Sequence, residues 1–199
     1  MEPRLGNYSR STGETQISVS VNLDGTGVSK ISSGNGVLDH MVNQLTRHGL
    51  IDIEIEAKGD SALTGWHHTV EDCGIALGRA FTNALGDGSG IRRMGHALVP
   101  LDEALARVAV DLSGRGYAHV DLGITGTNIA DLPGDLLRHF LESFAVEARI
   151  TLHIHVLEGV NAHHRAEAAF KALAKALKDA VELDPRSLDI VPSTKGSIS

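Results

Sequence analysis

Histidine is the residue type in this sequence with the most capacity for chemistry, because eleven histidines occur among 199 residues. Two adjacent pairs, His67–His68 and His163–His164, are followed by Glu71 and Glu167, four positions after the first histidine of each pair. Residues three or four positions apart share one face of an α-helix, so a glutamate can bind a metal together with a histidine of its own pair. Glu167 also lies three positions after His164, which leaves two pairings open there. Adjacent histidines point about 100° apart on a helix, so they face different targets.

A further histidine precedes each motif along the chain, at His40 and His139. The motifs and these two residues supply enough imidazoles and carboxylates for two metal ions, each with three histidines and one glutamate. Imidazole suits Zn, Cu, Fe and Ni, and a carboxylate shifts the preference toward harder ions such as Mn. Mixed histidine and glutamate ligands without cysteine argue against a purely structural zinc site. The predicted metal ligands are His40, His67, His68, Glu71, His139, His163, His164 and Glu167.

Several basic residues stand where they could hold a phosphate group. Arg93 follows the glycine-rich loop 86–90, Arg115 lies in a Ser-Gly-Arg-Gly turn, and Lys195 follows Ser193 closely. A guanidinium binds phosphate through two parallel hydrogen bonds, and lysine supplies a flexible point charge. Taken singly, each of these residues is expected to be solvated surface. The same expectation applies to the histidines that are not predicted metal ligands, which are His48, His96, His119, His153 and His155.

Hydrophobic periodicity predicts the elements that must position these residues. Alternating apolar residues predict strands, and apolar residues at helical spacing predict helices. The predicted strands are 14–23, 28–32, 51–57, 108–112, 118–122 and 150–156, and the predicted helices are 37–48, 69–85, 136–144 and 164–182. Turn-forming residues at 24–27 and 113–116 predict that the strands after them return as hairpins. The run from Pro100 to Glu103 is expected to begin a helix, with its acids near the positive end.

The second half of the chain repeats the order of the first: strand, strand, helix, strand, helix. The best local match aligns His67–Glu71 with His163–Glu167, and the strands and turns before these motifs also align. The alternative is a chance similarity of two amphipathic helices. We predict an α+β fold made by tandem duplication, with sheets packed against helices. A single domain over residues 1–199 is expected to contain two pseudo-repeats, about 14–90 and 103–185.

Composition excludes several classes of protein. Apolar residues make up 42% of the chain and charged residues 22%, which is typical of a globular fold. A net charge of −7 without a long basic run argues against nucleic acid as a partner. No apolar run approaches the roughly 18 residues of a membrane span, and the polar start lacks the apolar core of a signal peptide. With Cys73 as the one cysteine, we expect a cytoplasmic protein without internal disulfides.

A series of motifs follows in a fixed order along the chain. These motifs are Leu38–Met41, His67–Asp72, Gly90–Arg93, Pro100–Leu105, Val110–Arg115, His139–Phe140, His163–Ala172 and Pro192–Gly196. In this order they resemble the imidazoleglycerol-phosphate dehydratase family of histidine biosynthesis, over nearly the whole chain from about Gly13. The sequence departs from the usual family pattern at Gly65 and Trp66, where an acidic residue usually precedes the first histidine pair.

The resemblance implies a duplicated half-domain similar to ribosomal protein S5 domain 2. It also implies trimers that assemble into a 24-subunit shell, with two Mn²⁺ ions per active site and the active sites between subunits. One manganese is then expected to bind His40, His68, His163 and Glu167. The other is expected to bind His67, Glu71, His139 and His164.

The reaction implied by the resemblance is dehydration of D-erythro-imidazole glycerol phosphate to imidazole acetol phosphate and water. The two metals would hold the substrate's imidazole as a bridging imidazolate, because divalent cations favour the deprotonated form. Glu14 is expected to take the proton from carbon. The other expected catalytic residues are His40, His68, Glu71 and Glu167. The expected substrate contacts, mostly around the phosphate, are Glu14, Gln44, His48, Arg93, Arg115, Ser193 and Lys195.

Two other functions are compatible with the residues alone. A non-catalytic metal-binding assembly module would explain the histidine and glutamate sets without a need for Glu14 or the basic residues. A dinuclear metallohydrolase would use metal-bound hydroxide as its nucleophile. That class usually relies on several aspartate ligands, whereas histidine dominates here.

Overall fold

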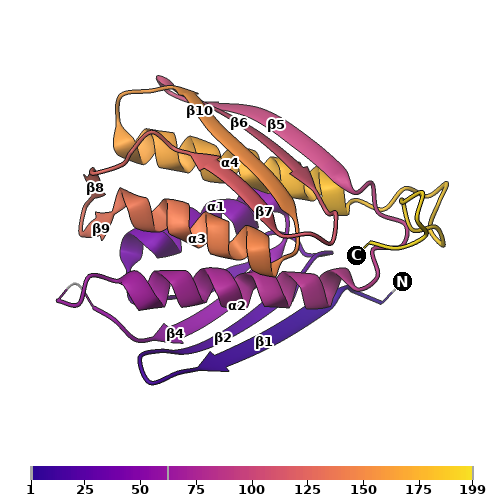
Figure 1. Cartoon of the computed structure of the whole chain (residues 1–199), viewed down its shortest axis with the longest axis horizontal. Coiled ribbons are helices and arrows are strands. Elements are labelled where there is room, and N and C mark those ends of the chain that lie inside the picture. The colour runs from indigo at the N-terminus through magenta and orange to yellow at the C-terminus, as the bar shows by residue number, and fades with distance from the viewer. Residues whose placement is uncertain (1, 62, 199) are drawn as a thin grey trace.

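Two β-sheets form the outer layers of the structure, and the long helices lie between them (Figure 1). The structure, a computed structural model, describes residues 2–61 and 63–198. Within these residues each large sheet has four strands, in the orders β1-β2-β4-β3 and β5-β6-β10-β7. No helix in this part of the chain is both long enough and apolar enough to cross a bilayer.

The first half of the chain supplies one sheet and two helices. Its elements are β1 (Leu5–Ser11), β2 (Gln16–Asn22), β3 (Ser29–Ser32), α1 (Gly36–Gly49), β4 (Asp52–Lys58) and α2 (His67–Leu85). Ile17, Val19 and Val21 of β2 are buried against the helices, while the serines between them face outward. Asn35 caps α1, because its side-chain oxygen accepts hydrogen bonds from the first backbone N–H groups of that helix.

The second half repeats this arrangement with one insertion. Its elements are β5 (Met94–Leu101), β6 (Ala104–Asp111), β7 (Tyr117–Asp121), β8 (Asn128–Ile129), β9 (Leu132–Pro133), α3 (Gly134–Glu147), β10 (Thr151–Glu158) and α4 (Ala162–Val181). The short strands β8 and β9 form a separate two-stranded sheet with each other. Without them, the element order and the strand order match those of the first half. The predicted α+β fold with two related halves is therefore confirmed.

The predicted hairpins are wrong in both halves. β3 lies parallel to β4, and β7 lies parallel to β10, at the sheet edge opposite β1 or β5. Two strands that the sequence pattern did not reveal, β1 and β5, pair antiparallel with β2 and β6 and occupy the place of the returning strand. In the first half, Asp52 also accepts backbone hydrogen bonds from Thr26, Gly27 and Val28 at 2.9, 2.9 and 2.8 Å. These hydrogen bonds hold the segment before β3 against the first residue of β4.

The run from Pro100 to Glu103 does not begin a helix. Leu101 pairs with Ala104 across the turn that joins β5 to β6, and Asp102 in this turn has a φ of 46°. A proline followed by acids suits both a helix start and a turn. The pairing of β5 along the free edge of β6 favours the turn, since an edge strand tolerates the missing N–H of Pro100.

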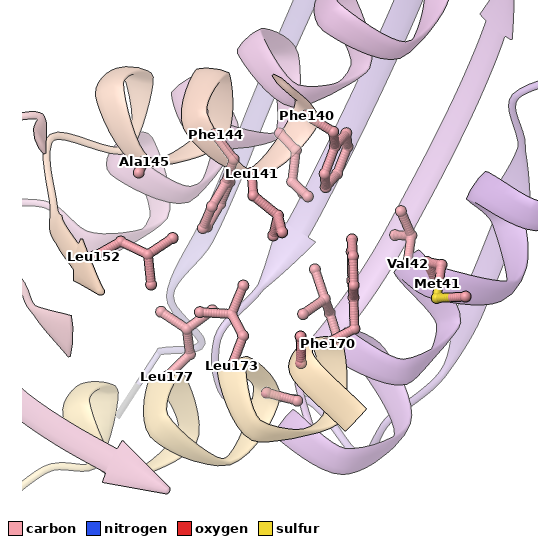
Figure 2. Close-up of a cluster of buried hydrophobic side chains, with 14 of the residues drawn as sticks. Met41, Val42, Phe140, Leu141, Phe144, Ala145, Leu152, Phe170, Leu173 and Leu177 are labelled. Carbon is pink, nitrogen blue, oxygen red and sulfur yellow. The ribbon is translucent and has the colours of Figure 1, made fainter. Parts of the chain in front are cut away.

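Large apolar side chains of α3 and α4 fill the space between the sheets (Figure 2). Phe140 and Phe144 of α3 lie opposite Phe170, Leu173 and Leu177 of α4, and all five are buried. The ring centroids of Phe140 and Phe170 are 6.0 Å apart. Burial of an aliphatic or aromatic side chain of this size contributes roughly 1.5–3 kcal/mol, so this core holds α3 firmly against α4.

Glycine allows the edge strands to lie directly on the helices. Gly6 of β1 contacts the backbone of α2 at Ala80, and Gly95 of β5 contacts the backbone of α4 at Ala176. A Cβ at either glycine would overlap that backbone. The two glycines occupy equivalent positions in the two halves, so the same close contact positions α2 and α4.

Replacement of Gly74 by alanine is expected to destabilise the protein, because α2 and α3 are in backbone contact at this residue. A Cβ at Gly74 would lie 2.6 Å from the carbonyl oxygen of Phe140. Gly74→Ala should therefore lower the free energy of unfolding in urea by roughly 1–3 kcal/mol. The matched control is Gly36→Ala at the start of α1, where a Cβ meets nothing within 4 Å. Equal stability of the two variants would contradict this account of the helix contact.

Candidate metal centre

The first metal group consists of His40 on α1 with His163 and Glu167 on α4. Both imidazoles direct Nε2 at one oxygen of Glu167, at 2.9 Å from His40 and 3.0 Å from His163. The two rings are stacked, with centroids 5.2 Å apart. The three ligand atoms lie within 4.8 Å of one another. Imidazole nitrogen and carboxylate oxygen therefore converge on one small space.

Glu167 is held in its ionised form. Its partial burial raises its pKa, but hydrogen bonds from Lys171, His40 and His163 outweigh this effect and lower the pKa to about 2. The Lys171 ammonium lies 2.7 Å from the second carboxylate oxygen. The sequence pattern gave Lys171 no functional role, although this residue lies four positions after Glu167 on the same helix face. The carboxylate thus keeps its negative charge at neutral pH and can serve as a ligand.

The second metal group consists of His67 and Glu71 on α2 with His139 on α3. Glu71 lies 3.8 Å from Nε2 of His67 and 3.3 Å from Nε2 of His139. The rings of His67 and His139 are stacked with centroids 5.2 Å apart, as in the first group. The ligand atoms again lie within 4.8 Å of one another.

Both groups join the two halves of the chain. In each group one half contributes a single histidine and the other half contributes a histidine and a glutamate four positions later on one helix face. This arrangement follows from the packing of α1 on α4 and of α2 on α3. Of the two pairings that spacing left open for Glu167, the structure shows the one with His163.

An unsatisfied atom shows that the second group fits a cation. Nε2 of His139 is buried and has no hydrogen-bond partner among the described residues, although it lies 3.3 Å from Glu71. A buried imidazole nitrogen without a partner lowers the stability of the fold, unless its lone pair binds a metal cation. A divalent cation between His67, Glu71 and His139 would bind that lone pair. Three converging ligands of this kind leave room for a fourth.

His68 and His164 belong to neither group within the chain. The ring of His68 faces Asp60, which also accepts a hydrogen bond from the His68 backbone N–H at 2.6 Å. Nδ1 of His164 lies 2.7 Å from Glu103. These hydrogen bonds raise the pKa of both histidines. The hydrogen bond from His164 is also the main reason that the pKa of Glu103 is lowered to about 2.

Glu14 lies on the turn between β1 and β2 and faces His68. Its carboxylate is 3.7 Å from Nε2 of His68 and is largely exposed. The turn is held against α2 by buried Asp72, which accepts hydrogen bonds from Arg10 at 2.7 Å and from Thr15. Sequence reasoning assigned no role to Asp72. Its position next to Glu71, on the buried face of the same helix, is the signal that could have revealed it.

The predicted phosphate-binding residues lie at the opposite end of the molecule. Arg93 makes two hydrogen bonds to Asp111, at 2.7 and 3.1 Å, and a third to the carbonyl of Pro192 at 2.8 Å. The contact with Asp111 raises the pKa of Arg93. The bond to Pro192 brings the segment with Ser193 and Lys195 beside Arg93. Arg115 lies in the turn after β6, at the same end of that strand as Asp111.

The length of α4 measures the separation between the metal groups and this end. His163 lies in the first turn of α4, and the Arg93 backbone N–H bonds to the carbonyl of Ala180 near the helix end. These 17 residues at 1.5 Å per residue span about 25 Å. The substrate that the resemblance implies, one imidazole ring with a three-carbon phosphate chain, is far shorter than this distance. A single chain therefore does not bring the predicted metal and phosphate residues together.

The other predicted substrate contacts lie on α1, between the two ends. Gln44 donates a hydrogen bond to the backbone carbonyl of His40 at 3.2 Å. His48 is half-buried two turns after His40, and burial lowers its pKa, with Lys171 and Lys175 acting in the same direction.

The loop before α2 is anchored by an aspartate that sequence reasoning missed. Trp66 has a φ of 64° and donates its indole N–H to Asp131 at 3.1 Å. Asp131 also accepts a hydrogen bond from Asn35, the cap of α1, at 3.3 Å. Asp131 thus ties the starts of α1 and α2 together beside His67. It lies within residues 123–133, a stretch in which no motif was recognised.

The remaining histidines of the second sheet lie away from both metal groups. His119 of β7 stacks with His153 and contacts His155 of β10, with ring centroids 5.8 and 4.8 Å apart. His96 lies on β5 of the same sheet, and it is exposed. His96, His119 and His153 are exposed, as expected, whereas His155 is partly buried.

Comparisons with known proteins agree over almost the whole chain. A family model described as imidazoleglycerol-phosphate dehydratase matches residues 33–177. The imidazoleglycerol-phosphate dehydratase of Paracidovorax citrulli (strain AAC00-1) is 54% identical over 195 residues, which cover 98% of this chain and 93% of the relative. The protein of the same name from Dehalococcoides mccartyi is 52% identical over 198 residues, which cover 100% of this chain and 99% of the relative.

Solved structures give the same result. Imidazoleglycerol-phosphate dehydratase from Staphylococcus aureus superposes with a TM-score of 0.81 at 33% identity, over 90% of this chain and 99% of the other. The enzyme from Pyrococcus furiosus, in complex with (S)-C348, gives a TM-score of 0.79 at 37% identity, over 94% of this chain and 98% of the other. The match of the family model to most of the chain, together with these full-length relatives, shows that the chain belongs to the imidazoleglycerol-phosphate dehydratase family.

Proposed function

We propose that this chain catalyses the dehydration of D-erythro-imidazole glycerol phosphate to imidazole acetol phosphate and water in histidine biosynthesis. We further propose that it uses two Mn²⁺ ions per active site. Membership of the family supports the activity. The observation that carries the metal dependence is the pair of converging groups, each with two imidazoles and one carboxylate within 4.8 Å. The unpartnered Nε2 of His139 supports the same conclusion.

Two copies of the chain are needed to complete each metal site under this proposal. His68 and His164 are the expected fourth ligands, but both face away from the metal groups of their own chain. His68 directly follows His67, a member of the second metal group. A copy whose His68 reaches the first metal group of a neighbour therefore brings its own second metal group alongside. The neighbour's His164 can then reach that second metal group in return.

Each active site would thus combine the first metal group of one copy with the second metal group of another. The ring centroids of His67 and His68 are 5.6 Å apart, and those of His163 and His164 are 6.3 Å apart. If both groups bind cations, the neighbouring histidines of each pair would place the two ions at one shared site, where they could act together on the substrate's imidazole. A reciprocal contact of this kind on every copy supports a closed assembly. We propose trimers that build a 24-subunit shell.

The phosphate-binding residues would also come from another copy. Arg93 lies about 25 Å from the first metal group of its own chain, by the length of α4, and its bond to Pro192 keeps Ser193 and Lys195 near it. At an interface between copies, one end of a chain can lie beside the other end of its neighbour. The basic groups would bind the phosphate and hold the carbon chain over the metals, and Gln44 and His48 would contact the substrate between them.

The chemistry requires loss of a hydroxyl and of a proton from adjacent carbons. When bound, the divalent cations would stabilise the anionic form of the substrate's imidazole and so weaken the C–O bond at the carbon attached to the ring. Glu14 would take the proton from the neighbouring carbon, the hydroxyl would leave as hydroxide, and this proton and this hydroxide together make up the one water that is lost. The enol that forms then becomes the ketone. Since Glu14 faces His68, it would approach the same neighbouring site as that ligand.

The whole chain, residues 1–199, would serve as one dehydratase domain built from the pseudo-repeats 14–90 and 103–185. The net charge of −7 supports the proposal that neither nucleic acid nor a membrane is a partner. A buried, unpaired Cys73 supports a cytoplasmic location.

Replacement of Glu14 by glutamine tests its role as the proton acceptor. An amide cannot take the proton, so turnover of Mn-loaded Glu14→Gln should fall roughly 100- to 10,000-fold. Metal content and particle mass should be unchanged, because Glu14 is in neither metal group. Glu54→Gln, an exposed substitution on the outer face of the first sheet, is the control and should keep full activity. A near wild-type rate for Glu14→Gln would remove this residue from the mechanism.

Mixed assemblies test whether an active site combines metal groups from two copies. His40→Ala disables the first metal group and His139→Ala disables the second, so each variant alone should be inactive. The two metal-free variants are mixed in equal amounts and reassembled with Mn²⁺. About one quarter of the sites should then contain both intact groups, and the activity should recover to about that fraction.

The control mixture combines His139→Ala with Glu71→Ala, which both disable the second metal group. This mixture should stay inactive, because no chain in it supplies an intact second group. Equal inactivity of the His40→Ala and His139→Ala mixture, with mixed particles shown by mass spectrometry, would mean that both groups of one chain serve the same site.

A further inference from the structure

Two carboxylates outside the metal groups hold His68 and His164, the two predicted ligands that belong to neither group. Asp60 lies 3.3 Å from Nδ1 of His68 and also accepts the backbone N–H of that residue. Glu103 lies 2.7 Å from Nδ1 of His164. Asp60 precedes α2, and Glu103 lies in the turn between β5 and β6, so neither belongs to the histidine motifs.

These two contacts differ from those in the metal groups in which ring nitrogen of the histidine faces the carboxylate. His40 and His163 direct Nε2 at Glu167, and His139 directs Nε2 at Glu71. His68 and His164 instead face their carboxylates with Nδ1. Among the described residues, the carboxylates nearest to these Nε2 atoms are Glu14, 3.7 Å from His68, and Asp102, 3.9 Å from His164.

A carboxylate that accepts a hydrogen bond from Nδ1–H fixes the tautomer of an imidazole. The lone pair then lies on Nε2, which is the atom free to bind a metal. The side chains of His68 and His164 are 45% and 30% exposed, so Nε2 can be reached from outside the chain. The histidines of the metal groups converge on a glutamate, whereas these two histidines keep Nε2 available for a ligand position outside their own group.

Both carboxylates are themselves fixed in place. Glu103 accepts backbone hydrogen bonds from Val160 and Asn161, at 3.2 and 2.9 Å, just before α4 begins. The side chain of Asp60 is only 9% exposed. A rigid acceptor restricts the conformations of the histidine that it binds. The histidine then loses little conformational entropy when it binds a metal.

We propose that Asp60 and Glu103 are positioning residues, which set the tautomer and direction of His68 and His164 so that Nε2 binds the metal group of a neighbouring copy. This inference rests on the proposed function, because it takes the two histidines as ligands across the interface. Asp60 and Glu103 would contact neither metal nor substrate. They would act only through the histidines.

Glu103→Gln separates this role from anchoring of the loop. The amide oxygen of glutamine can still accept from the backbone N–H groups of Val160 and Asn161, so the loop should stay in place. The amide nitrogen then faces Nδ1 of His164. Nδ1 must become the acceptor, and the ring proton moves to Nε2, where it blocks the metal.

The measurement is titration of the metal-free protein with Mn²⁺ alone, followed by electron paramagnetic resonance and calorimetry. Wild type is expected to bind two ions per chain. Glu103→Gln should bind one of them roughly 10- to 100-fold more weakly. Asp60→Asn should weaken the other by a similar factor. Nitrogen NMR of the imidazoles in metal-free Glu103→Gln should show the proton of His164 on Nε2, while the melting temperature stays unchanged.

The control is Glu158→Gln, an exposed acid at the end of β10 that makes no contact with His164 and should bind both ions as wild type does. Wild-type Mn²⁺ affinity at both sites of Glu103→Gln would overturn the inference and leave the proposed function standing. Failure of wild type itself to bind two ions would instead count against the proposed function. If Glu103→Gln does not fold, Asp60→Asn decides the matter: weaker binding of one ion supports the inference, and wild-type affinity at both sites overturns it.

Discussion

The packing of helices from one half on helices from the other half is the contact on which the rest of the structure depends. α1 lies on α4 and α2 lies on α3, and each contact brings a single histidine beside a histidine and a glutamate four positions apart. Backbone contact at Gly74 and the buried phenylalanines set the spacing of these helices. The ligand atoms are therefore positioned by rigid helices, as a metal site requires. Neither half alone can form a complete group.

Carboxylates perform two different tasks around the histidines. Glu167 and Glu71 face Nε2 and belong to converging groups, whereas Asp60 and Glu103 face Nδ1 and leave Nε2 available for a metal. Each chain thus has two metal groups of three ligands each, and two further histidines, His68 and His164, that belong to neither group. Under the proposed function these features are complementary, and one copy supplies what the next one lacks. The separation of about 25 Å between the first metal group and Arg93, estimated from the length of α4, has the same consequence for the phosphate-binding residues.

Local sequence patterns were sufficient for the parts of the fold that depend on one helix or one buried strand. The spacing of His163 and Glu167 predicted their shared face, and alternation predicted β2, β4, β6 and β10. The edge strands β1 and β5 were missed because glycine and polar residues weaken their alternation. The position of β3 beside β4 depends on pairing between distant residues. Asp60, Asp131 and Glu103 lie in turns, where their contacts appear only after the helices are in place.

The most direct test is an activity assay of purified, Mn-reconstituted protein with imidazole glycerol phosphate, beside a chelated control. The account predicts formation of the ketone product only with metal, and a large particle by light scattering that becomes smaller after verified metal removal. The smaller particle is expected because His68 and His164 would no longer link copies through the metals. Absence of turnover in protein shown to hold two metals per chain would contradict the account and favour a non-catalytic metal-binding module. Undiminished turnover after verified metal removal would contradict it as well.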